Sequence, residues 1–336
     1  MDMELAHVEA LVAIVRSGGF SQASASVHLT QPAISRRIAL LEKELGAPLF
    51  ERLPQGVILT EAGRAFLPHA EALLAKVRDG IEAVRDVSGT SRGTVTLAVV
   101  GTLASTSLTK RLRCFREEHP GVDLRIRTAL SVEVSALVLR GDAALGLRYN
   151  LDPNHSLVCS TVHQESLLPV CSPGHRLAKA RRVQLQELAG ERWVAFPPRI
   201  SGVYEPYSSA IEQRLAAVGI ATPDIIPIDS LTAQKRMVEA DFGLALLPES
   251  SVREELEAGT LCLLPVPALR ATVPVVLVHR RGAFLSGATQ ALAAELSGGL
   301  GAARLGAQGP RADGAGPGLR HAAGPRTGRR RSGPAA

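Results

Sequence analysis

Side chains that could hydrogen-bond to DNA lie close together near residue 31. Gln31, Ser35 and Arg36 fall within a few positions of one another. Glutamine and arginine can hydrogen-bond to base edges in the major groove, and serine can reach a base or a phosphate. These contacts require a helix that fits the groove, so the chemistry depends on the element that presents the three side chains.

The flanking residues predict such a helix. Thr30 can cap its free N–H groups, and Pro32 is tolerated in its first turn. Apolar residues then recur at helical spacing, at Ile34, Ile38, Leu41 and Leu45. At about 100° per residue, Pro32 and Arg36 face away from this stripe, with Gln31 and Ser35 on the flank.

The neighbouring segments predict a helix-turn-helix followed by a wing. A first helix is expected over residues 5–17, and a short second helix, capped by Ser21, is expected to run through Val27. Residues 47–52 and 57–60 have the pattern of two short strands. In a helix-turn-helix the second helix of the motif enters the major groove, and that position falls to the helix that carries Gln31.

The charge of the whole chain does not by itself support nucleic-acid binding. The chain has 38 Lys and Arg against 32 Asp and Glu, a net charge of +6. The segment 298–336 accounts for this excess, because it holds seven arginines and one acid, and the remaining residues balance. We expect this Arg-, Gly- and Pro-rich tail to be disordered. Two interpretations of it stay open: added nonspecific DNA affinity, or an unconstrained extension.

Other protein classes find little support. The four cysteines form no C-x-x-C pair, the nine histidines lack ligand spacing, and the start of the chain lacks a signal-peptide pattern. Residues 89–93 match the letters of a G-x-S-x-G elbow, but the expected order is helix then strand, the reverse of what an elbow needs. We therefore expect that the chain is not an enzyme, that it uses no cofactor or metal, and that it does not bind a membrane. We expect the protein to be cytoplasmic and associated with the nucleoid.

A long helix is expected from residue 61 to residue 87. Apolar or small residues alternate four and three apart, at Phe66, Ala70, Leu73, Val77, Gly80, Val84 and Val87. Such a heptad seam favours pairing with a second copy of the helix. The alternative is a helix packed against its own domain.

The remaining folded part has an α/β pattern. Strands at 94–100, 122–128 and 143–148 alternate with helices at 103–118 and 132–140, which indicates a mainly parallel sheet. A second unit is expected from strands at 166–171, 192–196, 224–228 and 243–247 with helices at 204–218 and 231–240. A last strand at 273–279 and helix at 287–296 would return to the first unit, with crossovers near 160–166 and 264–272.

Several motifs together resemble one known family. They are Gly19-Phe20-Ser21-Gln22-Ala23, Thr30-Gln31-Pro32-Ala33-Ile34-Ser35-Arg36, Leu41-Glu42, Leu45-Gly46, Leu49-Phe50-Glu51-Arg52 and Leu59-Thr60-Glu61-Ala62-Gly63. In this order they resemble the LysR-type transcriptional regulators, and the resemblance covers about residues 1–297. It implies an α/β fold class: an N-terminal winged helix-turn-helix, a long linker helix, and a two-subdomain α/β effector domain similar to type 2 periplasmic binding proteins.

The resemblance also implies domain bounds. The winged helix-turn-helix would span 1–60, the linker and dimerisation helix 61–90, and the effector domain 91–297, ahead of the tail at 298–336. Within the effector domain, subdomain I would comprise about 91–163 and 268–297, and subdomain II about 164–267. The implied partners are double-stranded promoter DNA, a small-molecule effector, and further copies of the chain as a homodimer or homotetramer.

The resemblance assigns DNA contacts to five residues: Gln31, Pro32, Ser35, Arg36 and, in support of the wing, Arg52. Arg37 lies nearer the buried stripe, which makes it a weaker candidate. The family usually has further basic residues in the wing, where this chain has Pro54, Gln55 and Ile58. The phosphate contacts of the wing are therefore expected to be weaker than usual.

Effector-binding residues are expected at the carboxyl ends of strands, where helix N-termini offer N–H groups to anions. This rule selects Thr102, Thr128, Arg148, Ser201 and Gly202, with Ser230 as a weaker candidate. Arg148 could pair with a carboxylate, so the expected effector is anionic. The alternatives are ordinary helix caps for Thr102 and Ser201 and a surface salt bridge for Arg148.

Two other functions stay open. Cys159 and Cys171 lie on either side of the expected crossover and could form a regulatory disulfide, as in redox-sensing members of the family. The chain could also be a ligand-binding module or enzyme whose DNA-binding half is vestigial.

Overall fold

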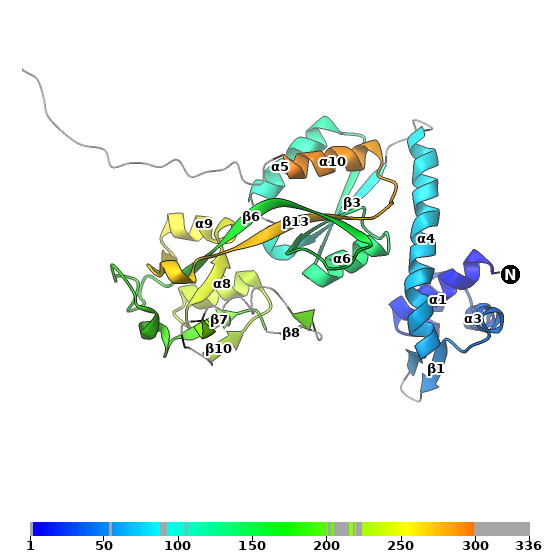
Figure 1. Cartoon of the computed structure of the whole chain (residues 1–336), viewed down its shortest axis with the longest axis horizontal. Helices are drawn as coiled ribbons and strands as arrows, with labels where there is room; N and C mark the ends of the chain where they lie inside the picture. Colours follow the sequence, from blue (N-terminus) through cyan, green and yellow to red (C-terminus); the bar gives the residue numbers. More distant parts are fainter. Residues whose placement is uncertain are drawn as a thin grey trace, which may run out of the picture. The chain divides into compact units, whose positions relative to one another are not determined.

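The N-terminal quarter of the chain forms a three-helix unit, a two-stranded wing and one long helix (Figure 1). The computed structural model describes residues 3–53, 56–87, 93–104, 106–197, 199–200, 203–204, 215–217, 219 and 224–298. The elements of this part are α1 (Leu5–Ser17), α2 (Phe20–Ser26), α3 (Gln31–Leu45), β1 (Phe50–Leu53), β2 (Gly56–Leu59) and α4 (Glu61–Val87). They confirm the predicted order of helix, short helix, helix, wing and long helix.

Local signals set the ends of these helices. Gly18 and Gly46 end α1 and α3 in the left-handed region, at φ of 77° and 73°. The hydroxyl of Thr30 accepts a hydrogen bond from the backbone N–H of Ala33 at 3.4 Å, as expected for the cap of α3. The expected cap of α2 was wrong: the helix begins at Phe20, so Gly19 takes the cap position and Ser21 lies in the first turn.

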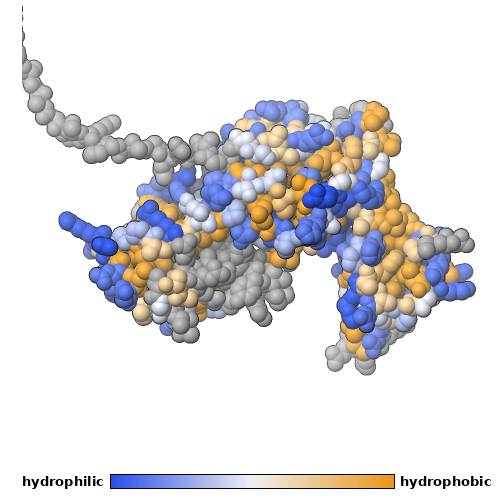
Figure 2. All heavy atoms as spheres, viewed as in Figure 1, coloured by the Kyte–Doolittle hydropathy of each residue, from blue (hydrophilic) through white to orange (hydrophobic). Residues whose placement is uncertain are grey.

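The long helix α4 is joined firmly to the winged unit at one end. Ala70 and Leu74 are buried in the same core as Val8, Leu11 and Ile34. Farther along, apolar side chains are exposed on one stripe, at Leu73, Val77, Ile81, Val84 and Val87, and Figure 2 shows apolar surface along this helix. The helix therefore uses one face within the chain and leaves a second apolar face unburied.

The α/β part begins with the predicted alternation of strands and helices. Its first elements are β3 (Thr94–Val100), η1 (Gly101–Leu103), α5 (Thr106–Glu118), β4 (Asp123–Ala129), α6 (Ser131–Leu139) and β5 (Leu145–Tyr149). Strand β3 lies between β4 and β5 and is parallel to both. These three strands are parallel as predicted, with bounds that differ from the prediction by at most two residues, but the rest of the same sheet pairs antiparallel, so the sheet as a whole is mixed.

Two long strands then cross the whole α/β part. They are β6 (Leu157–Cys171) and β13 (Ala271–Arg280), which pair antiparallel with one register shift between Val275 and Val276. Residues 160–166, expected as a connection, lie inside β6. The polar residues there, such as Ser160 and Gln164, resemble a loop in sequence because this stretch is only partly buried.

The remaining elements lie around the end of β6, except for the last helix, which packs against α5 and β13 as the predicted return to the first unit requires. They are η2 (Leu185–Leu188), β7 (Arg192–Ala195), β8 (Arg199–Ile200), β9 (Val203–Tyr204), β10 (Asp224–Pro227), α8 (Leu231–Glu239), β11 (Ala245–Pro248), α9 (Glu249–Ala258), β12 (Cys262–Leu263), η3 (Pro267–Leu269) and α10 (Gly287–Ser297). Strands β11 and β12 pair with β6, while β7 and β10 pair with each other. Helix α9 was not predicted, and most of the helix expected at 204–218 lies outside the described residues.

The close approach of Gly63 to the wing generates the first prediction. A Cβ at this position would lie 2.2 Å from the backbone oxygen of Leu49. We expect Gly63→Ala to lower the free energy of unfolding by about 1–3 kcal/mol, because the backbone cannot move aside without disturbing the core. Denaturant unfolding followed by circular dichroism measures this change.

Gly80 on the same helix is the matched control, because a Cβ there would meet no atom within 4 Å in the chain. Gly80→Ala should leave stability unchanged or raise it by up to about 1 kcal/mol. Equal effects of the two substitutions would contradict the close contact at Gly63.

Candidate nucleic-acid interface and ligand cleft

The face of α3 that is opposite its core stripe is open to solvent. Gln31, Pro32 and Arg36 are exposed, and Ser35 is half-buried. The side chains of Ile34, Ile38 and Leu41 on the other face are buried in the winged unit. Helix α3 thus buries its apolar face in the winged unit and presents its polar face to solvent, as a helix that binds in the major groove of DNA must do.

Glu42 fixes the wing to this helix. Its Oε1 accepts hydrogen bonds from the backbone N–H groups of Leu49 at 2.7 Å and Phe50 at 3.3 Å. Phe50 also packs edge-on against Phe20, with ring centroids 5.6 Å apart. Glu42 belongs to the Leu41-Glu42 motif, but its contact with the wing could not be predicted from the sequence.

The wing itself is only partly described. The backbone of Arg52 pairs with Val57 in the β1–β2 ladder, while its side chain, like Pro54 and Gln55, lies outside the described residues. Ile58 is 47% exposed, so an apolar side chain occupies part of the wing surface.

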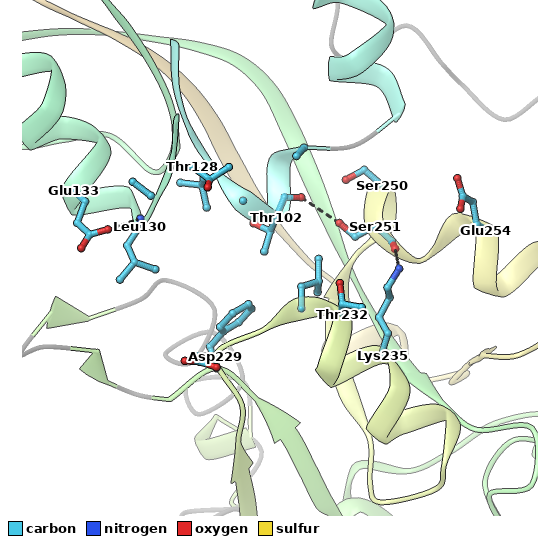
Figure 3. Close-up of a pocket in the computed structure, with 16 residues that line it drawn as sticks. Thr102, Thr128, Leu130, Glu133, Asp229, Thr232, Lys235, Ser250, Ser251 and Glu254 are labelled. Carbon is cyan, nitrogen blue, oxygen red and sulfur yellow. Dashed lines mark hydrogen bonds between the residues drawn. The ribbon is translucent and has the colours of Figure 1, made fainter. Parts of the chain in front are cut away.

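A cavity of about 650 Å³ lies among the ends of β3 and β4 and the starts of α8 and α9 (Figure 3). Thr102 and Thr128 line it, together with Leu130 and Glu133. The other wall carries Asp229, Leu231, Thr232, Lys235, Ser250, Ser251 and Glu254. Thr102 and Thr128, two of the residues expected to bind the effector because they follow the carboxyl ends of strands, therefore line the same cavity.

The two walls already touch at Thr102. Its hydroxyl donates a hydrogen bond to the Tyr149 hydroxyl at 3.1 Å, and its carbonyl oxygen accepts one from the Ser251 hydroxyl at 3.1 Å. Thr102 is 8% exposed, so it serves chiefly to hold the floor of the cavity. Thr128 is exposed and leaves its hydroxyl available to the cavity.

The other expected effector residues are placed differently. Ser201 and Gly202 lie outside the described residues. Ser230 caps α8 by accepting a hydrogen bond from the backbone N–H of Ala233 at 3.4 Å, and it is absent from the cavity lining. Ser230 is therefore an ordinary helix cap in this structure.

Arg148 is also away from the cavity lining and is 6% exposed. It donates to the Ser135 hydroxyl at 2.7 Å and to the Tyr149 carbonyl at 3.2 Å, and it forms an ion pair with Asp152. Burial would raise the pKa of Asp152, but hydrogen bonds from Ser135 and the Asn154 backbone, with the charge of Arg148, together hold it below its ordinary value. The pairing of Arg148 is thus internal in this structure, as in the alternative interpretation of a salt bridge, except that the pair is buried and not on the surface.

The proposed disulfide between Cys159 and Cys171 is wrong. Both residues lie on the continuous strand β6, and twelve residues of strand separate them by about 40 Å. A disulfide requires Cα atoms within about 7 Å. Cys171 instead faces Cys262 across the β6–β12 ladder, and burial raises the pKa of its thiol to about 12.

Membrane-spanning helices and metal-binding clusters are both absent from the described residues. No helix among them combines the length and apolarity needed to cross a membrane. Their His, Cys, Asp and Glu side chains form no group of three or more placed to hold a metal ion.

Comparison with known proteins matches both halves of the chain. Residues 5–64 match the family model described as "Bacterial regulatory helix-turn-helix protein, lysR family", and residues 88–300 match the "LysR substrate binding domain". The transcriptional regulator CfxR of Cupriavidus necator is 32% identical over 267 residues, which are 79% of this chain and 81% of CfxR.

Solved structures share the fold. A variant of full-length OxyR from Pseudomonas aeruginosa has a TM-score of 0.66 at 17% identity and covers 88% of this chain and 95% of its own. Full-length CbnR in complex with its target DNA has a TM-score of 0.59 at 21% identity, with 88% of this chain and 99% of CbnR covered.

The buried Arg148–Asp152 pair generates a prediction about stability and pH. At neutral pH, Asp152→Asn should lower the free energy of unfolding by about 3 kcal/mol, because it leaves the Arg148 charge buried without a counter-charge. The pKa of Asp152 is lower in the folded chain than its ordinary value of 3.8. The wild-type advantage is therefore present above pH of about 4 and shrinks as the pH falls through the folded pKa.

Urea unfolding at a series of pH values measures this difference. Asp123→Asn is the matched control, because its partner Arg125 is 66% exposed and an exposed pair contributes little. Equal losses in the two variants, or a loss in Asp152→Asn that is independent of pH, would contradict the buried ion pair.

Proposed function

This chain belongs to the LysR family of bacterial transcriptional regulators, and we propose that it binds promoter DNA as a homodimer and responds to a ligand in its α/β cleft. As a regulator of this family it is not an enzyme. The chain would then be divided as expected, with DNA binding in 1–60, dimerisation in 61–90 and effector binding in 91–297. A protein with this role would act in the cytoplasm, at the nucleoid.

The DNA contacts would come from α3. The observation that carries this part is the exposed face with Gln31, Pro32 and Arg36 on a helix whose opposite face is buried in the core. Arg36 and Gln31 would hydrogen-bond to base edges, and Ser35 to a base or phosphate. Arg52 would support the wing near the phosphate backbone.

The homodimer would form along α4. The exposed residues Leu73, Val77, Ile81, Val84 and Val87 recur at spacings of four and three, as in a helix pair. The stripe contains Ile81, whereas the heptad seam predicted from the sequence contains Gly80 at this point of the helix. Pairs of dimers would assemble into the tetramer that the family resemblance implies.

The cleft would act by binding its ligand more tightly in one domain arrangement than in another, since equal affinity shifts no equilibrium. Thr102 and Thr128 are the two expected residues that support this role from the cavity lining. The expectation of an anionic ligand has less support, because the described lining carries three carboxylates, Glu133, Asp229 and Glu254, against the one ammonium of Lys235.

The first experiment tests the DNA-binding face. Duplexes selected from a random-sequence library by the full-length protein provide the probe, and a gel-shift titration measures affinity. We expect Arg36→Ala to weaken binding by about 1–3 kcal/mol, roughly 5- to 150-fold, while the size-exclusion profile stays unchanged.

Arg113→Ala on α5 is the control, because Arg113 is 64% exposed and far in sequence from the motif. An Arg36→Ala variant that binds the selected duplex as tightly as the wild type would contradict the assignment of this face of α3 to DNA recognition. Failure of the wild-type protein to select any duplex would favour the alternative of a vestigial DNA-binding half.

The second experiment tests the dimer. Val84 is 68% exposed in the single chain, so Val84→Glu should not disturb its fold. In a helix pair the glutamate would be buried, and we expect the dimer dissociation constant to rise at least about tenfold in analytical ultracentrifugation. Ala72→Glu, also exposed on α4 but off the stripe, should leave the dimer intact; a dimer insensitive to Val84→Glu would refute this interface.

A further inference from the structure

We infer that the ligand of the cleft is a small organic cation, an alkyl or aryl amine or guanidine, held between Glu133 on one wall and Asp229 on the other. The inference rests on the proposed effector role of the cleft. It goes beyond that role by naming the chemical class of the ligand and the two side chains that recognise its charge.

The described lining of the cleft is negative. It has three carboxylates, Glu133, Asp229 and Glu254, against the single ammonium of Lys235, a formal charge of −2. All three carboxylates are exposed. Among the described residues, Asp229 and Glu254 have no hydrogen-bond or ion-pair partner, and Glu133 uses only Oε2, which accepts from the Leu130 N–H at 3.0 Å.

Lys235 does not offset this charge toward a ligand. Its ammonium donates a hydrogen bond to the backbone oxygen of Ser251 at 3.1 Å and forms an ion pair with Glu255. Both interactions hold α8 against α9, and the side chain is 20% exposed. The charge of the Lys235 ammonium is thus already neutralised by Glu255, which lies on the same wall of the cavity.

Side chains of the protein also form hydrogen bonds at the N-termini of three helices near the cleft, α6, α8 and α9. Glu133 caps α6, and Ser230 caps α8. Glu165, which is 4% exposed, accepts hydrogen bonds from both the N–H and the hydroxyl of Ser250 at the start of α9, at 3.1 and 2.9 Å. At each of these three helix starts, one backbone N–H group is therefore already engaged by a side chain of the protein.

The two recognising carboxylates come from different walls. Glu133 belongs to α6, beside β3 and β4, and Asp229 lies between β10 and α8. Figure 3 shows both at one end of the cavity, with Lys235 and Glu254 at the other. A cation bound between Glu133 and Asp229 would pair with one carboxylate from each wall.

The rest of the lining suits the body of such a ligand. Leu130, Phe196 and Leu231 contribute apolar surface to the cavity. Thr128 and Thr232 add hydroxyl groups that can accept or donate a hydrogen bond. The cavity therefore fits an ammonium or guanidinium group attached to an alkyl or aryl body.

Matched probes of opposite charge test the inference on the full-length protein. Benzylamine and butylamine are compared with benzoate and butyrate by thermal shift and calorimetry at low salt. We expect the two amines to bind and raise Tm, and the two carboxylates to have no effect. Glu133→Gln and Asp229→Asn should each weaken amine binding at least about fivefold, the loss of one charge-assisted contact, and together abolish it.

The variants are chosen to preserve the fold. In Glu133→Gln, the side-chain carbonyl oxygen of the glutamine can still accept the capping hydrogen bond from the Leu130 N–H, so the substitution changes mainly charge. Glu118→Gln on α5 is the control, because it removes an exposed carboxylate outside the cavity lining. Amine binding in Glu118→Gln should equal that of the wild type.

Three results would overturn the inference: no amine binding at millimolar concentration, binding of the carboxylates instead, or amine binding unaffected by both substitutions in the cleft. Thr128→Trp, which fills the cavity, separates this inference from the proposed function. A carboxylate whose binding is lost in Thr128→Trp overturns the ligand class but leaves the cleft as the effector site. An amine that still binds Thr128→Trp overturns the assignment of this site.

Discussion

The pairing of β6 with β13 is the constraint on which the α/β part depends. All ten residues of β13 pair with β6, and the two strands then attach to different neighbours. Strand β13 pairs with β5, which leads to β3 and β4, whereas β6 pairs with β11 and β12. Because each wall of the cleft is built on one side of this ladder, the ladder fixes the walls to each other and leaves the cavity between them.

The chemistry of the cleft follows from how the helix ends around it are satisfied. A helix N-terminus placed at a cavity attracts an anion only when its N–H groups are free. Here Glu133, Glu165 and Ser230 each engage one N–H group, at the starts of α6, α9 and α8, and Lys235 is held by Glu255. The carboxylates that remain give the cleft its negative character, so the same elements that suggested an anion from sequence favour a cation once their partners are known.

The sequence predicted elements best where the signal is local. The bounds of α4 and β3 match the prediction, because heptad spacing and an apolar run are contained within each segment. The exposed polar face of α3 was likewise predictable, because the Thr30 cap and the apolar stripe lie within the helix segment itself. Ser21 failed as a cap because Gly19 allowed the helix to begin earlier.

Contacts between residues that lie far apart in the sequence could not be predicted. The partly buried middle of β6 carries polar residues that only the β13 ladder makes into a strand, and this continuity separates Cys159 from Cys171. Arg148 ends a strand as expected, but Asp152 and Ser135 turn it inward. Asp229 and Lys235 belong to no motif, and only their position on the cavity identifies them.

Native-state hydrogen exchange of the full-length protein tests most directly whether the β6–β13 ladder unites the two walls. If it does, amides along both strands, from Leu157 to Cys171 and from Ala271 to Arg280, will exchange slowest and share one free energy of opening. If the amides near Cys171 instead open separately, at a lower free energy than those near Leu157, the two walls are independent units and the account is contradicted.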